Sequence, residues 1–313
     1  MTDLQLAQYG IWTKEDFIMG LLDGKVALVT GAGGGLGRAH ALLLAKEGAA
    51  VVVNDLGGSR DGKGAGQGMA DQVVAEIESA GGKAVANYGS VSDPAQAAAM
   101  VQTAVAHFGG IDICINNAGI LRDKSFKNMN DEMWDVIIDV HLRGTYLVTK
   151  AAYDQMLVQG RGGRIIMTSS TSGLLGNFGQ TNYGAAKAGI AGFARCLYPE
   201  ATKYGITVNV LAPGAWSRMT EDLYPEETKA AAKEAAAPEK VSPAIVWLCT
   251  DEAAGITGRT FMISGNRVSL LSWQRTEVAA KSSQGDPWNV RDIGDAILAS
   301  ENSWPPIKPE RPK

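Results

Sequence analysis

The sequence of 313 residues predicts an α/β protein with a doubly wound, mostly parallel seven-stranded sheet and helices on both faces. From residue 25 onward, short runs rich in valine and isoleucine alternate with longer alanine-rich stretches of helical character. The runs are apolar on both faces, which is typical of strands buried in a parallel sheet. A glycine-rich turn joins the first run to the first helical stretch, as is typical of doubly wound sheets.

Seven runs are expected to form the strands. They cover residues 25–30, 50–55, 83–88, 111–116, 164–169, 207–212 and 259–264. Residues 56–68 contain six glycines and are expected to form a long mobile loop after the second strand. The pattern predicts an N-terminal extension at 1–18, a doubly wound domain at 19–270 and a C-terminal extension at 271–313.

Composition and charge exclude several classes of function. The formal net charge is -4 and the chain has no run of five or six like charges, so a nucleic-acid surface is not expected. No apolar run reaches the roughly 20 residues of a membrane span, and the N-terminus lacks a secretion signal, so the cytoplasm is the expected location. Three cysteines in apolar segments predict buried thiols, and three histidines without metal-ligand spacing predict no metal site. The expected partner is a small molecule.

The segment TGAGGGLG at 30–37 carries a clear signal for a ligand. A strand, a glycine-rich turn and a helix start let backbone N–H groups and a helix N-terminus meet a pyrophosphate. Gly31 is expected to make the turn, while Gly35 and Gly37 allow close approach of phosphate and sheet. The predicted dinucleotide contacts of this turn are Gly31, Gly33, Gly35, Leu36 and Gly37.

Asp55 ends the second predicted strand, 20 residues after Gly35, where a carboxylate can accept hydrogen bonds from an adenosine ribose. The same negative charge would repel a 2′-phosphate, so the expected cofactor is NAD, with NADP less favoured. The alternative is a strand-end aspartate that caps the following loop. Arg38, Arg60 and Lys63 keep NADP open, because each could fold towards a phosphate.

Tyr183 and Lys187 stand four residues apart in TNYGAAKAG, a stretch of mostly small side chains. On a helix the two side chains share one face, so the lysine cation can favour the tyrosine phenolate. Oxidation of an alcohol requires a base, and an unperturbed tyrosine, with a pKa of about 10, is a poor base at neutral pH. Gly184, Ala185 and Ala186 are expected to leave room for a cofactor against this helix.

Ser170 lies thirteen residues before Tyr183, at the end of a predicted strand, and its hydroxyl is a candidate to hydrogen-bond the substrate oxygen. A Tyr-x-x-x-Lys pair alone is common as a surface pair on helices. With Ser170, Asp55 and the glycine turn in one chain, a catalytic site is the stronger interpretation. The competitors for the role of Ser170 are Ser169, Thr171 and Ser172.

These motifs, together with NNAG at 116–119, resemble in order and spacing the short-chain dehydrogenase/reductase family over roughly residues 19–265. The resemblance implies a Rossmann fold with Tyr183 as general acid and base. It also implies that Lys187 holds the nicotinamide ribose and lowers the tyrosine pKa, and that Ser170 polarises the carbonyl. The loop after Gly214 is expected to close over nicotinamide and substrate. Further implied cofactor contacts are Ser90, Val91, Asn117, Ala118, Gly119, Pro213 and Gly214.

One position departs from the family pattern. The segment VHLRG places His141 where the family usually has asparagine in the helix after NNAG. The resemblance implies a proton relay through a water on the backbone carbonyl at this position, so another side chain need not abolish it. His141 is therefore either a catalytic relay residue or a packed helix residue.

Longer segments resemble, more narrowly, the (3R)-hydroxyacyl-CoA dehydrogenase units of multifunctional β-oxidation enzymes. The segments NNAGILRDKSF, VHLRGTY, APGAWSRMT and the late SWQRT carry this resemblance. It implies the interconversion of a (3R)-3-hydroxyacyl-CoA and its 3-ketoacyl-CoA. The alternatives are a dehydrogenase of 17β-hydroxysteroids or steroid-CoA esters, and a non-catalytic NAD-binding protein.

Three further expectations concern the surroundings of the site. A short helical lid is expected within 218–240, with apolar contacts from Met219, Leu223 and Tyr224. The apolar face at 135–156 predicts a homodimer or homotetramer. Candidate ligands for CoA phosphates are Arg122, Lys124, Lys127, Arg143 and Arg218.

Overall fold

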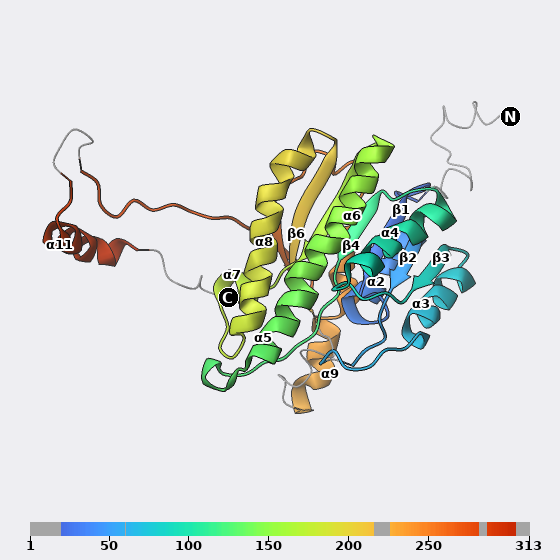
Figure 1. The fold of residues 1–313 in the computed structure, drawn as a ribbon, viewed down its shortest axis with the longest axis horizontal. Coiled ribbons are helices and arrows are strands. Elements are labelled where there is room, and N and C mark those ends of the chain that lie inside the picture. Colours follow the sequence, from blue (N-terminus) through green and yellow to red (C-terminus); the bar gives the residue numbers. More distant parts are fainter. Residues whose placement is uncertain (1–19, 60, 216–225, 282–286, 305–313) are drawn as a thin grey trace. The chain divides into compact units, whose positions relative to one another are not determined.

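The computed structural model describes residues 20–59, 61–215, 226–281 and 287–304. The chain divides into two compact units, Met1–Leu270 and Leu271–Lys313. The first unit holds a β-sheet that lies between helices (Figure 1). The second unit holds helix α11, Val290–Ser300, whose first turn is capped by the side chain of Asn289.

In the residues that the structure describes, eight strands form one sheet in the order β3-β2-β1-β4-β5-β6-β7-β8. Its centre is β1, whose residue Ala27 pairs in parallel with Val51 on one side and Ile113 on the other. The chain winds outward from β1 to β3 and then from β4 to the opposite edge, so the direction of winding reverses between β1 and β4. Such a reversal opens a crevice at the carboxyl ends of the strands, where ligands of this fold bind. The strands are β1 (Val26–Thr30), β2 (Ala50–Asn54), β3 (Lys83–Asn87), β4 (Ile113–Asn116), β5 (Gly163–Thr168), β6 (Ile206–Gly214), β7 (Thr260–Ser264) and β8 (Arg267–Leu271).

The doubly wound class is confirmed, but the predicted count of seven strands is wrong. The eighth strand, β8, follows β7 after a two-residue turn at Gly265 and Asn266. A turn this short joins antiparallel neighbours only. The sequence RVSLL of β8 is mostly exposed, so it lacks the two-sided apolar pattern that predicted the buried strands.

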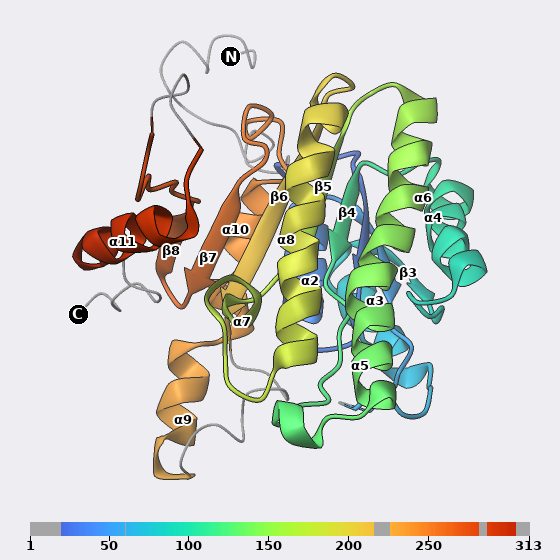
Figure 2. The same ribbon diagram turned by 60° about the vertical axis from the view of Figure 1, so that its left-hand side comes forward.

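Helices cover both faces of the sheet (Figure 2). One hydrophobic core packs residues of α2, α3 and α10 against the sheet, and a second core on the other face is built from α4, α6 and α8. The helices of the first unit are α2 (Gly35–Lys46), α3 (Gly68–Ser79), α4 (Pro94–Phe108), α5 (Asp131–Ile137), α6 (Gly144–Gln159), α7 (Thr171–Leu175), α8 (Thr181–Thr202), α9 (Glu226–Ala235) and α10 (Ser242–Trp247). None of the described helices is long and apolar enough to cross a membrane.

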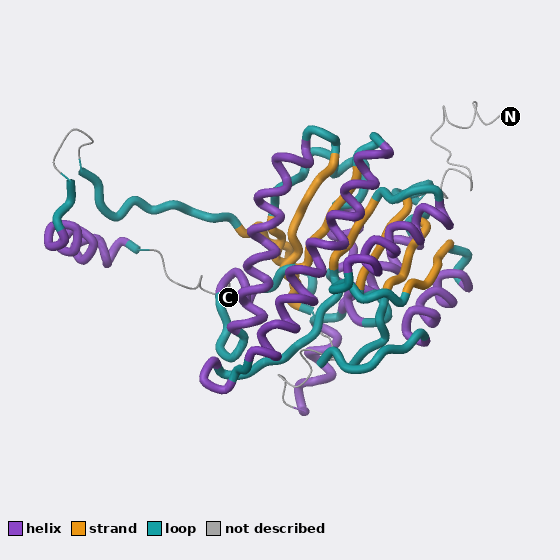
Figure 3. Tube along the Cα trace, in the orientation of Figure 1, coloured by secondary structure: helices purple, strands orange, loops and turns teal. Residues whose placement is uncertain are grey.

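Helices α5 and α6 are joined without a break by a π-helical turn, η2, at Ile138–Arg143. A π turn inserts extra backbone into a helix and is frequent at functional sites. In Figure 3 the loops that follow β2 and β4 lie at one end of the sheet. This end carries the carboxyl termini of the strands, and it is where the predicted site residues meet.

The expectation of three buried thiols is wrong for one cysteine. Cys114 and Cys249 are buried and free, whereas Cys196 on α8 is free and exposed. A 22-residue helix on a sheet buries only one of its faces, so an apolar neighbourhood in sequence did not determine on which face the thiol lies.

Candidate active site

The glycine turn between β1 and α2 is as tight as its sequence predicts. Gly31 has a φ of 63°, and a Cβ added there would lie 2.8 Å from the Cα of Ala118. A Cβ on Gly37 would lie 2.2 Å from the carbonyl oxygen of Gly31, so the first turn of α2 packs directly on the loop. Helix α2 begins without a side-chain cap, which leaves its first N–H groups to an anionic ligand. The donor set therefore fits a pyrophosphate.

A threonine that the sequence analysis did not single out joins this turn to the NNAG segment. The hydroxyl of Thr30, which is 1% exposed, accepts hydrogen bonds from the N–H groups of Asn117 (3.0 Å) and Ala118 (3.1 Å). The side-chain amide of Asn117 donates in turn to the carbonyl oxygens of Thr30 (3.0 Å) and Gly31 (3.1 Å). The position of Thr30, directly before the first glycine, was the available sequence signal.

Asp55 directly follows β2, and both of its carboxylate oxygens are engaged. Oδ2 accepts a hydrogen bond from the N–H of Gly33 at 2.8 Å, and Oδ1 accepts one from the N–H of Gly57 at 2.7 Å. Asp55 therefore caps the loop that follows β2, as the alternative interpretation predicts, and it also binds the backbone of the glycine turn. Each carboxylate oxygen has a second lone pair, which can accept a hydrogen bond from a ribose hydroxyl.

The other predicted cofactor residues lie around the same carboxyl edge. Val91 and Ala118 line one small hollow together with Thr30. Ser90 follows β3, and its hydroxyl lies 2.9 Å from that of Ser92. Pro213 and Gly214 end β6 and pair in parallel with Ile263 and Ser264 of β7. The structure thus brings the glycine turn and the ends of β3, β4 and β6 to one edge.

Tyr183, Lys187 and Ser170 come together where β5 ends against α8. Tyr183 and Lys187 lie one turn apart on α8, and the ammonium nitrogen lies 5.6 Å from the centre of the tyrosine ring. Lys187 Nζ donates a hydrogen bond of 2.6 Å to the carbonyl oxygen of Thr168, the last residue of β5. Ser170 caps α7, and its side chain is hydrogen-bonded to that of Tyr183.

Burial changes the ionisation of both groups on α8. It raises the pKa of Tyr183 to about 12, against which the hydrogen bond from Ser170 acts, and it lowers the pKa of Lys187 to about 7. The expected lowering of the tyrosine pKa by Lys187 is therefore not seen. The lysine is itself desolvated, and its ammonium points to a carbonyl oxygen, so the burial of the phenol dominates.

The structure separates Ser170 from two of its competitors. The Ser169 hydroxyl donates to the carbonyl oxygen of Lys187 at 2.6 Å, and the Ser172 hydroxyl donates to Gln180 Oε1 at 2.7 Å. The Ser169 hydroxyl therefore binds the backbone of α8, and the Ser172 hydroxyl binds the residue that precedes α8.

Of the small residues after Tyr183, Ala185 is exposed, whereas Ala186 is fully buried. The small size of Ala186 therefore serves helix packing, and only Gly184 and Ala185 fit the expected role of leaving room for a cofactor.

His141 lies in the π turn and is buried beside the site. Its Nε2 lies 2.8 Å from the carbonyl oxygen of Ile120 and 3.1 Å from the N–H of the same residue, while Nδ1 has no partner among the described residues. The ring stands edge-on to that of Tyr183, with centroids 5.2 Å apart. A Cβ on Gly119 would lie 2.3 Å from the His141 ring, which explains a glycine there. Burial lowers the pKa of His141 well below 6.5, so the ring is neutral.

Several expectations fall outside the described residues. These are the loop directly after Gly214, the lid residues Met219, Leu223 and Tyr224, and the cations Arg60 and Arg218. Within the expected lid, helix α9 forms at Glu226–Ala235. Among the described residues, no group of three or more His, Cys, Asp or Glu side chains is placed to hold a metal ion.

A glycine turn at a winding reversal, with a serine, a tyrosine and a lysine gathered beside it, defines an oxidoreductase of the doubly wound dinucleotide-binding class. The comparison with known families gives the particular group. The model of the family described as short chain dehydrogenase matches residues 25–228, and the chain belongs to this family. Its members use a nicotinamide cofactor.

Two curated relatives and one solved structure are similar over most of the chain. The peroxisomal multifunctional enzyme type 2 of Mus musculus is 50% identical over 91% of this chain, which spans 38% of the length of that enzyme. The hydroxyacyl-CoA dehydrogenase ChsB1 of Mycobacterium tuberculosis is 40% identical, with 87% of each chain covered. A crystal structure of a short chain dehydrogenase from Mycobacterium avium is 41% identical, with a TM-score of 0.80 over 92% of this chain and 98% of that one.

Proposed function

We propose that the protein is an NAD-dependent dehydrogenase that interconverts a (3R)-3-hydroxyacyl-CoA and its 3-ketoacyl-CoA. The observation that carries the chemistry is the cluster of Ser170, Tyr183 and Lys187 beside the glycine turn. The substrate class is supported by the relative named as a hydroxyacyl-CoA dehydrogenase, which is similar along 87% of both chains.

The bound cofactor would accept hydride from the carbinol carbon, or return it to the ketone. In the oxidation direction, the Tyr183 phenolate takes the hydroxyl proton, and in the reduction direction the phenol returns it. The hydroxyl of Ser170 can donate a hydrogen bond to the substrate oxygen while that oxygen carries charge. Lys187 supplies a cation beside the phenolate and, on release from the Thr168 carbonyl, a donor for the ribose hydroxyls.

The oxidation direction needs the phenolate, and burial holds the pKa of Tyr183 at about 12. A positive charge that arrives beside the ring favours the phenolate and lowers this pKa. Oxidation should accordingly become faster as the pH rises, and reduction faster as it falls.

The preference for NAD rests on charges around the end of β2. Asp55 places a carboxylate there, which disfavours a 2′-phosphate. The guanidinium of Arg38 forms an ion pair with Glu76 on α3, so this cation is already engaged. Lys63 is exposed and lies 3.8 Å from Asp61.

The cationic residues proposed to bind CoA phosphates differ in whether their side chains already donate hydrogen bonds within the protein. Arg122 donates through Nε to the carbonyl oxygen of Asp61, and Arg143 donates to the carbonyl oxygen of Ser92. Lys124, in the loop that follows β4, and Lys127, in the short 3-10 helix η1 at Phe126–Asn128, are both exposed. These two lysines are the better candidates for contact with CoA phosphates.

The decisive assay follows NADH absorbance with NAD and three alcohols in parallel. They are a medium-chain (3R)-3-hydroxyacyl-CoA, its (3S) enantiomer and a 17β-hydroxysteroid. We expect turnover with the (3R) thioester alone. Preference for the steroid would overturn the substrate and leave the chemistry of Tyr183 in place. Binding of NADH without turnover of any alcohol would favour the non-catalytic alternative.

We further propose that the protein acts as a homodimer or homotetramer. Helix α6 presents the exposed apolar side chains of Tyr146 and Val158, which are 47% and 82% exposed in the single chain. Light scattering of the purified protein tests this proposal, and a monomer at working concentration would contradict it.

We also propose a cytoplasmic location, which imaging of the tagged protein tests. The alternative location is the peroxisome, which the name of the mouse relative gives for that enzyme.

A further inference from the structure

The glycine-rich insert between β2 and α3, residues 56–66, has a defined internal structure in the residues described. The N–H of Gly66 donates to the carbonyl oxygen of Leu56 at 2.9 Å, which closes the base of the insert. The N–H of Ser59 donates to the carbonyl oxygen of Lys63 at 2.8 Å, which closes its tip. The insert therefore folds back on itself, with one hydrogen bond at its base and one at its tip.

The base of the insert is tied to the glycine turn through one side chain. Asp55 accepts hydrogen bonds from Gly57 at the start of the insert and from Gly33 in the turn between β1 and α2. A displacement of the insert at its base therefore acts directly on the backbone that meets the pyrophosphate.

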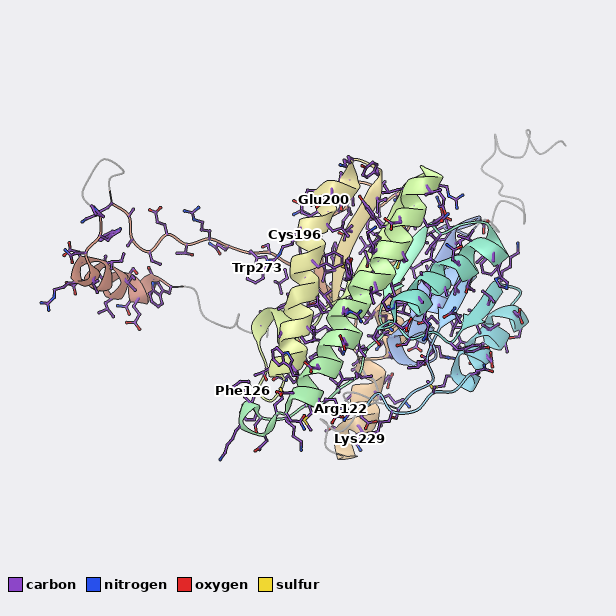
Figure 4. The ribbon with its side chains drawn as sticks, in the orientation of Figure 1. Arg122, Phe126, Cys196, Glu200, Lys229 and Trp273 are labelled. Atoms are coloured by element: carbon purple, nitrogen blue, oxygen red, sulfur yellow. The ribbon has the colours of Figure 1, made fainter. Side chains whose placement is uncertain are left out.

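The tip of the insert contacts the loop that follows β4. Arg122 Nε donates a hydrogen bond of 2.8 Å to the carbonyl oxygen of Asp61. Gly62 lies against Ile120, because a Cβ built on this glycine would come within 2.9 Å of Ile120 Cδ1. Figure 4 shows Arg122 at the same end of the unit as Phe126 and Lys229.

The sheet order shows where this contact lies relative to the crevice at the carboxyl end of β1. Strands β2 and β4 flank β1 on opposite sides, so an insert that starts after β2 and reaches the loop after β4 crosses the carboxyl end of β1. The glycine turn leaves the sheet at that point, and dinucleotides bind in the crevice there.

Two hydrogen bonds, both through Asn182, link Arg122 to Tyr183 on helix α8. The carbonyl oxygen of Arg122 accepts a hydrogen bond of 3.1 Å from the side-chain amide of Asn182, which is fully buried. The side-chain oxygen of Asn182 accepts one of 2.8 Å from the N–H of Tyr183. Arg122 thus stands between the insert and the residue proposed as the base.

We propose that the insert is a part of the dinucleotide site, held across it by Arg122 and Ile120, and that Arg122 is a positioning residue for the cofactor. This inference rests on the proposed function, because it takes the crevice to bind NAD. Its consequence is kinetic: a backbone segment fixed at both ends slows the release of the dinucleotide.

The test measures the binding and release of NADH by fluorescence, without substrate, in the full chain. Arg122→Gln removes the positive charge and the Nε donor, and Arg122→Lys keeps the charge but lacks the Nε donor. We expect both to accelerate NADH dissociation about tenfold, as for the loss of one hydrogen bond from a charged donor.

A matched pair of glycines probes the same junction from the other side. Gly62 and Gly64 both lie in the insert with positive φ, 82° and 77°, but a Cβ on Gly64 meets no atom of the described residues within 4 Å. Gly62→Ala should accelerate dissociation as Arg122→Gln does, and clearly more than Gly64→Ala, which adds the same backbone strain without a clash against Ile120. The double variant Arg122→Gln, Gly62→Ala should show less than the sum of the two effects, because both break one contact.

Two results would overturn the inference. The first is NADH dissociation at the wild-type rate in both Arg122 variants, with a raised KM for the acyl-CoA, which would make Arg122 a substrate ligand. The second is an equal effect of Gly62→Ala and Gly64→Ala, which would reduce the result to backbone strain. A wild-type protein that binds no NADH would overturn the proposed function as well, and the two failures are thus distinguishable.

Discussion

The two sides of the active site hold their polar groups in opposite ways. Around the ends of β1, β2 and β4, Asp55 and Asn117 are hydrogen-bonded to the backbone of the glycine turn and of Thr30 before it. Around the end of β5, Tyr183 and Lys187 are ionisable groups whose pKa values burial moves in opposite directions. The first side is a scaffold with a fixed geometry, and the second responds to a charge brought beside it. The predictions that follow test this division in order of expected size.

The largest effect is expected on the side that carries ionisable groups. Tyr183→Phe removes the group that we propose to exchange the proton and should lower kcat about 10³-fold, within the range of general acid–base catalysis. The affinity for NADH, measured by fluorescence titration, should change little. Turnover that survives this substitution would mean that another group is the base.

A serine pair on the same side provides a smaller effect with its own control. Ser170→Ala should lower kcat about 10²-fold, because the hydroxyl beside Tyr183 no longer stabilises charge on the substrate oxygen. Ser172→Ala removes a hydroxyl that donates to Gln180 and should leave kcat within about threefold of wild type. Equal losses in steady-state assays of the two variants would show that Ser170 has no special position.

The scaffold side should respond in binding and stability. Asp55→Asn replaces one acceptor by an amide donor that faces a backbone N–H, so we expect the Kd for NADH to rise about tenfold and the free energy of unfolding to fall by about 1–3 kcal/mol. Titration and urea denaturation measure the two quantities. A large fall in kcat with unchanged NADH affinity would contradict the division between the two sides.

His40 on α2 is a buried ionisable group of the scaffold side. Burial lowers its pKa to about 4, its Nδ1 lies 2.8 Å from the Ser242 hydroxyl, and its Nε2 has no partner among the described residues. Because the unfolded chain binds this proton more tightly, the stability contribution is complete above about pH 6.5 and is lost as the pH falls towards 4.

Between pH 7.5 and 5 the expected loss from His40 is on the order of 2 kcal/mol. Urea midpoints at the two pH values measure the loss. His40→Met should reduce the dependence on pH, whereas His107→Gln, at an exposed position, should retain it. An unchanged pH dependence in His40→Met would assign the effect to other groups.

Much of the fold follows from local patterns in the sequence. Seven strands could be predicted because strands buried on both faces leave continuous apolar runs, while the exposed β8 leaves no such run. The glycine turn could be predicted because only glycine tolerates the backbone of Gly31 and the contact at Gly37. The exposure of Cys196 could not, because it depends on which face of α8 meets the sheet.

The sequence by itself determined the order of the strands along the chain, the glycine turn between β1 and α2 and the pairing of Tyr183 with Lys187, because each depends on residues close in sequence. Only the tertiary structure decided that Ser170 is the serine that meets Tyr183, that His141 packs on Ile120, and that Arg122 holds the insert. These contacts join segments far apart in the chain. Their geometry follows from the sheet order and the packing of helices on it, which no local pattern encodes.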